Sequence, residues 1–89
     1  ESRRGYAGLT LEDQLGEVMV KAVEPNRPAA RAGVAVGDVV LKLNDNRFRL
    51  TSGSAMYELE AAATGTQMKL TLERGEKQLT VVLTIEAAP

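Results

Sequence analysis

Alternation of apolar and polar residues is clearest in the last quarter of the chain. A period of two is typical of half-buried β-strands, because successive side chains of a strand point to opposite faces. The pattern predicts strands over 67–73 and 78–85, joined by a hairpin turn over 74–77. The apolar positions expected to share one face are Met68, Leu70 and Leu72 in the first strand and Leu79, Val81, Leu83 and Ile85 in the second.

Shorter apolar stretches fill the first half of the chain, separated by residues that favour turns. Gly16 marks one turn, and Glu24-Pro25-Asn26 marks the next. Pro28 suits the first position of a helix and Gly33 suits its end, so one helical turn is expected over 28–32. The other segments are predicted as strands over 6–11, 17–23, 39–43 and 47–50, with a turn over 13–16.

One longer helix is predicted over 55–63. The hydroxyl groups within 51–54 can cap its N-terminus, and Met56, Leu59 and Ala63 form one apolar stripe along it. Many short strands with two helices predict a mainly β fold of the α+β class. The expected architecture is a small, partly open β-barrel or sandwich of five to six strands, capped by helices. A sheet edge should lie beside the longer helix.

Length and charge narrow the class of protein further. A chain of 89 residues is too short for two cores, so a single domain is expected over 5–86, with short tails at 1–4 and 87–89. Eleven basic and twelve acidic residues leave a formal charge of −1, without the concentrated positive charge that nucleic-acid binding needs. No apolar run approaches the roughly 20 residues of a membrane-spanning helix.

The residue types present argue against catalysis. The sequence has no His and no Cys, which excludes a Ser-His-Asp triad, a Cys-His pair and the usual zinc ligands. A dyad of Ser52 or Ser54 with Lys42 or Lys77 is compatible with the composition, but no motif supports it. The glycines at 33 and 37 lack the Lys and hydroxyl residue of a phosphate-binding loop. A non-catalytic module without metal or cofactor is therefore expected.

The strongest motif covers residues 28–44, which read Pro-Ala-Ala-Arg-Ala-Gly-Val-Ala-Val-Gly-Asp-Val-Val-Leu-Lys-Leu-Asn. This segment resembles the signature of PDZ domains: a helical turn of small residues, Ala-Gly-aliphatic, Gly-Asp, an apolar strand and Asn at a turn. Asp45-Asn46 stands where the family usually has Gly, and both residues tolerate a left-handed backbone. Asp38 is expected to accept backbone hydrogen bonds as part of the scaffold.

A second motif, Arg4-Gly5-Tyr6-Ala7-Gly8-Leu9, resembles the carboxylate-binding loop of bacterial PDZ domains. In high-temperature-requirement (HtrA) proteases this loop commonly reads Arg-Gly-Tyr-apolar-Gly-apolar and begins the domain, as it does here. Ala7 is smaller than the usual Ile or Leu. Consecutive backbone N–H groups of such a loop can hold a carboxylate without any side chain.

The two resemblances imply a binding groove between the first strand and the longer helix. The strand would pair with an extended ligand, which gives affinity independent of the ligand's sequence. The helix stripe would line a pocket for the ligand's last side chain. The implied ligand-binding residues are Arg4, Tyr6, Ala7, Gly8 and Leu9 in the loop, Thr10 and Leu11 in the strand, and Ala55, Met56, Leu59 and Ala63 in the helix.

The resemblance implies a peptide-binding module that captures the carboxyl end of an unfolded or extended polypeptide. Its host would be a bacterial HtrA-like serine protease in the periplasm, with this monomeric domain recruiting substrates or regulating the enzyme. An alternative stays open: a structural or docking PDZ domain of another host, such as an aminopeptidase, a processing protease or a secretion component. That domain would bind an internal segment or no free terminus.

Overall fold

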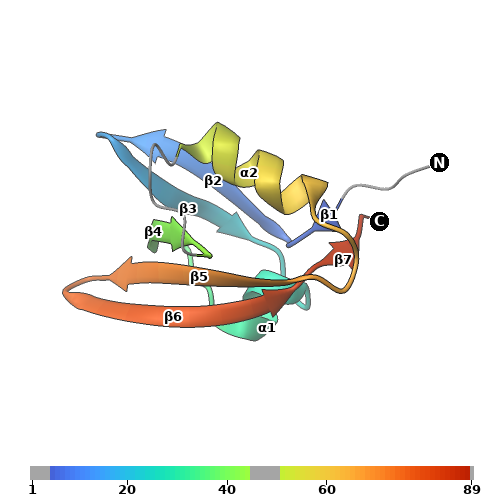
Figure 1. Cartoon of the computed structure of the whole chain (residues 1–89). Coiled ribbons are helices and arrows are strands. Elements are labelled where there is room, and N and C mark those ends of the chain that lie inside the picture. The colour runs from blue at the N-terminus through green and yellow to red at the C-terminus, as the bar shows by residue number, and fades with distance from the viewer. Residues whose placement is uncertain (1–4, 45–50, 89) are drawn as a thin grey trace.

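The computed structural model describes residues 5–44 and 51–88. These residues form seven strands and two short helices (Figure 1). The mainly β fold with two helices, expected from the sequence, is confirmed. The elements are β1 (Gly5–Tyr6), β2 (Leu9–Gln14), β3 (Glu17–Val23), α1 (Pro28–Ala32), β4 (Val39–Leu43), α2 (Ser52–Ala61), β5 (Gln67–Arg74), β6 (Lys77–Thr84) and β7 (Glu86–Ala87).

Among the described residues, the strands form two antiparallel sheets that do not close into a barrel. Five strands follow the order β2-β3-β4-β5-β6, and β1 pairs separately with β7. The long β5–β6 hairpin keeps its register from Gln67 opposite Thr84 to Arg74 opposite Lys77. In the five-stranded sheet, β2 and β6 are the edge strands, with α2 beside β2 and α1 beside β6 (Figure 1).

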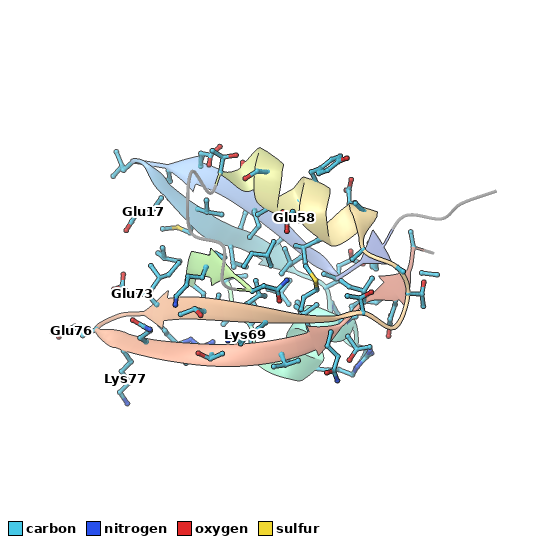
Figure 2. All side chains as sticks on the ribbon, in the orientation of Figure 1. Glu17, Glu58, Lys69, Glu73, Glu76 and Lys77 are labelled. Carbon is cyan, nitrogen blue, oxygen red and sulfur yellow. The ribbon has the colours of Figure 1, made fainter. Side chains whose placement is uncertain are left out.

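The core is aliphatic and collects the positions that the alternating pattern assigns to one face. Met68, Leu70 and Leu72 of β5 are all buried, as are Leu83 of β6 and Ile85 just after it. Leu79 and Val81, assigned to the same face, are half-buried and pack against the core. Of the charged side chains labelled in Figure 2, Glu17, Glu76 and Lys77 lie at the hairpin ends opposite the chain termini. The remaining buried apolar side chains come from β2, β3, β4 and the two helices, and from the loops beside them.

The predicted strand over 6–11 is interrupted in the structure. Tyr6 ends β1 and Leu9 begins β2, because the two halves pair with different partners: Tyr6 lies opposite Glu86 of β7, and Leu9 lies opposite Val23 of β3. The chain changes direction at Gly8, whose φ of 77° is unfavourable for residues with a side chain. The predicted strand over 47–50 lies outside the described residues.

The long helix starts and ends earlier than the sequence pattern indicates. Thr51 is its N-cap: the Thr51 hydroxyl accepts a hydrogen bond from the Ser54 amide at 3.0 Å, and the Ser54 hydroxyl accepts one from the Thr51 amide at 2.9 Å. This capping box begins the helix at Ser52. Ala62 is already extended, so Ala63 lies beyond the helix and is exposed.

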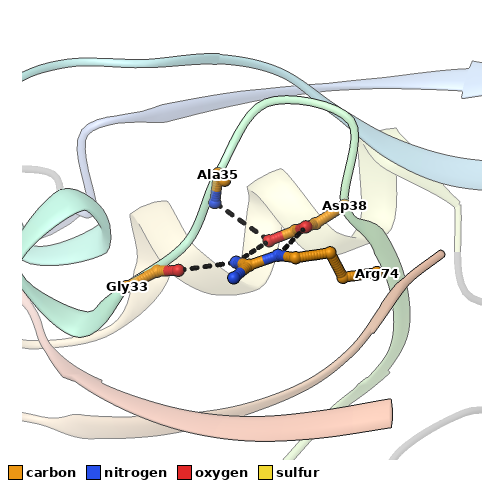
Figure 3. A network of polar contacts seen from close by, with 4 residues as sticks. All are labelled: Gly33, Ala35, Asp38 and Arg74. Atoms are coloured by element: carbon orange, nitrogen blue, oxygen red, sulfur yellow. Dashed lines mark hydrogen bonds and ion pairs between the residues drawn. The ribbon is translucent and has the colours of Figure 1, made fainter. Parts of the chain in front are cut away.

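Asp38 has the scaffold role expected from the 28–44 motif. One of its carboxylate oxygens accepts a hydrogen bond from the Ala35 amide at 2.9 Å, and both accept hydrogen bonds from Arg74 (Figure 3). Arg74 also donates to the Gly33 carbonyl at 2.7 Å. The end of β5 is thus tied to the loop between α1 and β4, a contact that the sequence analysis missed.

Candidate functional site

A free sheet edge runs beside the longer helix. Within the described part of the chain, β2 pairs only with β3, so its other edge has no strand partner. Helix α2 lies along that edge and runs in the opposite direction to β2 (Figure 1). An unpaired edge next to a helix can accept a further extended chain, because its backbone N–H and C=O groups are available for pairing.

The loop between β1 and β2 turns its amides toward this edge. The Ala7 carbonyl accepts a hydrogen bond from the Ala29 amide, and the Gly8 carbonyl accepts one from the Glu24 amide, both at 2.8 Å. Across a trans peptide the N–H points opposite to the C=O. The amides of Gly8 and Leu9 therefore point away from α1 and β3, toward the free edge.

The Gly8 amide takes part in no backbone hydrogen bond among residues 5–44 and 51–88. Two neighbouring donors with one common direction form a small concave nest, the kind of backbone arrangement that accepts an anion. The loop reaches this shape through the positive φ of Gly8 and through its two carbonyl bonds to the segment 24–29.

Arg27 packs against the β1–β2 loop at Gly8. A Cβ atom on Gly8 would lie 2.3 Å from the Arg27 Cβ, so the two backbones approach as closely as a glycine permits. The Arg27 guanidinium lies 5.5 Å from the centre of the Tyr6 ring, within the range of a cation–π interaction. Arg27 also lies 3.5 Å from a carboxylate oxygen of Glu86.

Glu86 connects this cation to a second one. Arg31 donates a hydrogen bond to Glu86, which, together with the contact to Arg27, holds the pKa of the Glu86 carboxyl below its ordinary value. Two guanidinium groups thus contact one carboxylate behind the loop. The sequence analysis named Arg4, which lies outside the described residues, among the ligand-binding residues and did not single out Arg27.

The two ends of α2 are fixed to the strands on either side of the loop. Near its C-terminus, a Cβ on Gly5 would lie 2.5 Å from the Leu59 carbonyl oxygen and 2.6 Å from that of Ala62. At its N-terminus, both the amide and the hydroxyl of Ser52 donate to Asp13 of β2, each at 2.8 Å. These bonds hold the pKa of the Asp13 carboxyl below its ordinary value, with the backbone bond as the larger cause.

Most of the sequence-predicted ligand-binding residues lie along this edge. Ala7, Leu9 and Leu11 are buried on the side that faces the core, and Thr10 is exposed on the opposite face. Tyr6 belongs to β1 instead of the loop. On α2, Ala55 and Leu59 are 1% exposed, Met56 is half-buried, and the exposed Ala63 is separate from them.

Two features that shape this site were not found from the sequence. Asp13 was assigned to a turn, yet it lies in β2 and reaches α2. Ser52 was considered as one of several capping hydroxyls and as a possible member of a Ser-Lys dyad, and its bond to Asp13 joins residues 39 positions apart. No short-range pattern signals such a contact.

Neither a metal site nor a membrane-spanning helix occurs in the residues that the structure covers. Within 5–44 and 51–88, no three His, Cys, Asp or Glu side chains come together as ligands for a metal ion. None of the helices in these ranges has the length and apolar character to cross a membrane.

Comparison with known proteins gives one consistent result. The family model described as PDZ domain matches residues 5–85. The serine endoprotease DegS of Escherichia coli K12 is 32% identical over 77 residues, which cover 86% of this chain and 21% of DegS. The DegS of Haemophilus influenzae is 32% identical over 89 residues, covering 97% of this chain and 26% of that protein.

Solved structures of two proteases also resemble this chain. A serine endoprotease from Yersinia pestis is 33% identical, with a TM-score of 0.83 over 98% of this chain and 30% of its own. An HtrA-type protease, AlgW S227A with a decapeptide, shares the fold with a TM-score of 0.87 at 20% identity, over 100% of this chain and 30% of its own. The chain thus spans about a fifth to a third of the proteins it matches.

Proposed function

Since this chain belongs to the PDZ domain family, we propose that it captures the C-terminal carboxylate and the last apolar residues of an extended polypeptide by strand addition to β2. The observation that supports this function is the common direction of the Gly8 and Leu9 amides, toward a sheet edge that has α2 beside it. The segment itself is non-catalytic, in agreement with the lack of His and Cys.

The proposed ligand would lie antiparallel to β2, between β2 and α2. Its terminal carboxylate would accept hydrogen bonds from the Gly8 and Leu9 amides, and the Arg27 guanidinium behind the loop would add a favourable positive charge. Its last side chain would face Leu59, and the third residue from its end would face Ala55 and Met56. These contacts favour apolar residues at both ligand positions.

The proposal is tested by titration of the domain with an apolar-ended peptide and with its C-terminally amidated twin. Backbone 1H–15N resonances give the site-specific readout. We expect the free-acid peptide to shift the amides of Gly8 and Leu9, and the amidated peptide to bind at least about tenfold more weakly, since a charge-assisted hydrogen bond contributes about 1.5–3 kcal/mol. Equal affinity of the two peptides would exclude carboxylate capture.

A docking role is the second candidate, because the expected pocket is largely filled by the chain itself. Leu9 and Leu11 are only 7% and 8% exposed, and they belong to the same buried cluster as Ala55 and Leu59 of α2. In a docking domain this packing would be the permanent state. The same titration separates the two functions: no shift of the Gly8 and Leu9 amides with any free-acid peptide would favour docking.

We assign the parent protein to the HtrA-like serine proteases, with this domain as its substrate-recruiting or regulatory part. The support is the match to DegS and to HtrA-type structures, one of which was solved with a decapeptide. A relative from Clostridium perfringens, provisionally described as a zinc metalloprotease, is 33% identical over 75 residues and represents the other class of host.

The HtrA-like assignment also implies a periplasmic location and a monomeric isolated domain. A serine-protease domain that precedes residue 1 in the parent protein, with hydrolysis stimulated by the free-acid peptide, would support this host. Metal-dependent hydrolysis would contradict it. Analytical ultracentrifugation of the isolated domain tests the oligomeric state.

A further inference from the structure

A hollow lies between the C-terminal half of α2 and the segments where β4 ends and β5 begins. Its volume is about 330 Å³, a size that suits a small ligand or a single large side chain. Six residues line it: Asn44, Tyr57, Glu58, Ala61, Ala62 and Met68. Neither β2 nor the loop at Gly8 contributes a lining residue, so the hollow is separate from the proposed carboxylate site.

Two alanines explain why this space stays open. Residues three and four positions apart lie on one face of a helix, so Ala61 follows Tyr57 and Glu58 along the same face of α2. The side chains of Ala61 and Ala62 are too short to fill the distance to β5. Met68 of β5 is 4% exposed, the only buried residue of the lining, and it provides an apolar floor.

Asn44 forms a fixed wall of the hollow. Its side-chain oxygen accepts a hydrogen bond from the Lys69 backbone amide at 2.9 Å, and its side-chain nitrogen donates to the Met68 sulfur at 3.7 Å. Successive side chains of a strand point to opposite faces, so the Lys69 side chain points away from the face of Met68. The lining residues therefore include no basic group.

Tyr57 and Glu58 give the hollow its chemical character. The Tyr57 side chain is 73% exposed, so the face of its ring is available to attract a cation. Glu58 projects from α2 on the side that faces β5 (Figure 2). Its carboxylate forms no hydrogen bond or ion pair with any residue in 5–44 or 51–88. An unpaired anion and an open aromatic ring thus border an apolar floor.

An arginine side chain matches this combination. Its alkyl stem can cover an apolar floor, its planar guanidinium can stack on an aromatic ring, and its N–H groups can pair with a carboxylate. The ammonium group of lysine is compact and more strongly hydrated, so it gains less from a planar ring. The charge of Glu58 further selects a cation over a neutral group of the same shape.

We propose that the hollow between α2 and β5 is a binding site for an arginine side chain of a partner protein. Glu58 is the counter-ion of the guanidinium group, Tyr57 is its stacking surface, and Met68 with the two alanines contacts the alkyl stem. This site is independent of carboxylate capture at Gly8 and Leu9.

The test is an NMR titration with N-acetyl-arginine methylamide and with the corresponding capped citrulline. Citrulline has nearly the same shape but carries an oxygen in place of one guanidinium nitrogen and no charge. Neither probe has a free carboxylate, so neither can use the loop at Gly8. We expect the arginine probe to shift the Met68 methyl and Tyr57 ring resonances, and the citrulline probe to bind at least about fourfold more weakly.

Substitution of Glu58 tests the counter-ion. In Glu58→Gln the ratio of arginine to citrulline affinity should fall to half of its native value or less, because the charge-assisted pairing is lost. Glu76→Gln is the matched control: it makes the same change in net charge at the β5–β6 turn, outside the lining. Its ratio should equal that of the native domain. Both positions are exposed, so the fold should persist in both variants.

Substitution of Tyr57 tests the stacking surface. Tyr57→Leu keeps an apolar side chain but removes the aromatic ring, so it should weaken the arginine probe about twofold or more. Tyr57→Phe keeps the ring and should bind the probe as the native domain does. Equal losses in the two variants would contradict stacking on the ring.

Each remaining outcome also decides the proposal. Equal binding of the arginine and citrulline probes to the native domain would overturn it, as would an unchanged ratio in Glu58→Gln. A capped lysine that binds as tightly as the capped arginine would overturn the assignment to a guanidinium group. Shifts at Gly8 and Leu9 without shifts at Met68 would overturn the location. None of these results bears on carboxylate capture, which the amidated peptide tests separately.

Discussion

Arg74 donates a hydrogen bond to each carboxylate oxygen of Asp38, both at 2.8 Å, and so joins the end of β5 to the α1–β4 loop (Figure 3). Asp38 is 1% exposed, whereas the Arg74 side chain is half in solvent. A buried carboxylate is stable only while its partners are present. The pair therefore holds the Gly-Asp segment of the PDZ signature in place, at some distance from the binding edge.

Asp38→Asn should destabilise the domain strongly. The substitution keeps the size of the side chain but removes the charge that Arg74 and the Ala35 amide compensate, so we expect a loss of about 2–4 kcal/mol in the free energy of unfolding. Urea denaturation provides the measurement. Glu24→Gln, a substitution at an exposed turn, is the control and should change stability by less than about 0.5 kcal/mol. Similar unfolding midpoints for the two variants would contradict the assigned role.

The same carboxylate should make stability dependent on pH in acid. Hydrogen bonds from Arg74 hold the pKa of Asp38 below its ordinary value of 3.8, and the Ala35 amide adds to this effect. Because the folded pKa lies below the unfolded one, the stabilisation is complete above pH 3.8 and disappears as the pH falls through the folded value. Thermal unfolding between pH 2 and pH 6 checks this. Asp38→Asn should show a shallower loss below pH 3.8, and an unchanged acid profile would exclude Asp38 as its source.

Gly5→Ala should loosen the contact between β1 and α2. The new methyl group would lie 2.5 Å from the Leu59 carbonyl oxygen and 2.8 Å from Cγ2 of Ile85, so the helix must shift at a cost of about 1–3 kcal/mol. Gly53→Ala is the natural comparison, because its nearest neighbour is 3.9 Å away and alanine favours a helix by up to about 1 kcal/mol. Unfolding midpoints should move in opposite directions, and equal shifts would contradict the close approach.

Gly8→Ala should destabilise the domain more than Gly16→Ala. The two glycines have nearly the same φ, 77° and 79°, so the backbone strain of an alanine is similar at both, about 1–2 kcal/mol. Only at Gly8 would the methyl group also meet a neighbour, the Arg27 Cβ at 2.3 Å, whereas no atom lies within 4 Å at Gly16. The difference in unfolding free energy between the variants measures this clash.

Arg27→Gly provides the second arm of that experiment. In the Gly8→Ala background it removes the Cβ that the new methyl group would meet, so it should recover part of the lost stability. In the native background it should only destabilise, since it removes the contacts with Tyr6 and Glu86. No recovery in the double variant would mean that Arg27 does not limit the residue at position 8.

Local sequence patterns determined most of the secondary structure. The limits of β3, α1 and β4 were predicted as the structure has them, because each lies between a turn residue and a run of apolar residues. The alternating apolar positions of β5 and β6 likewise identified the buried face of the hairpin. In these segments the local preference and the final packing agree.

The tertiary structure decided what distant segments do to one another. The pairing of β1 with β7 and of β2 with β3 interrupts the predicted first strand at Gly8. The Thr51–Ser54 capping box and the extended backbone at Ala62 set the limits of α2 at Ser52 and Ala61. Contacts such as Asp13 with Ser52 depend on the positions of whole elements, which no window of neighbouring residues contains. The sequence by itself therefore determined the family and the residues along the free edge of β2. Folding decided which way the Gly8 and Leu9 amides point, because that direction is set by two hydrogen bonds between residues 16 and 22 positions apart.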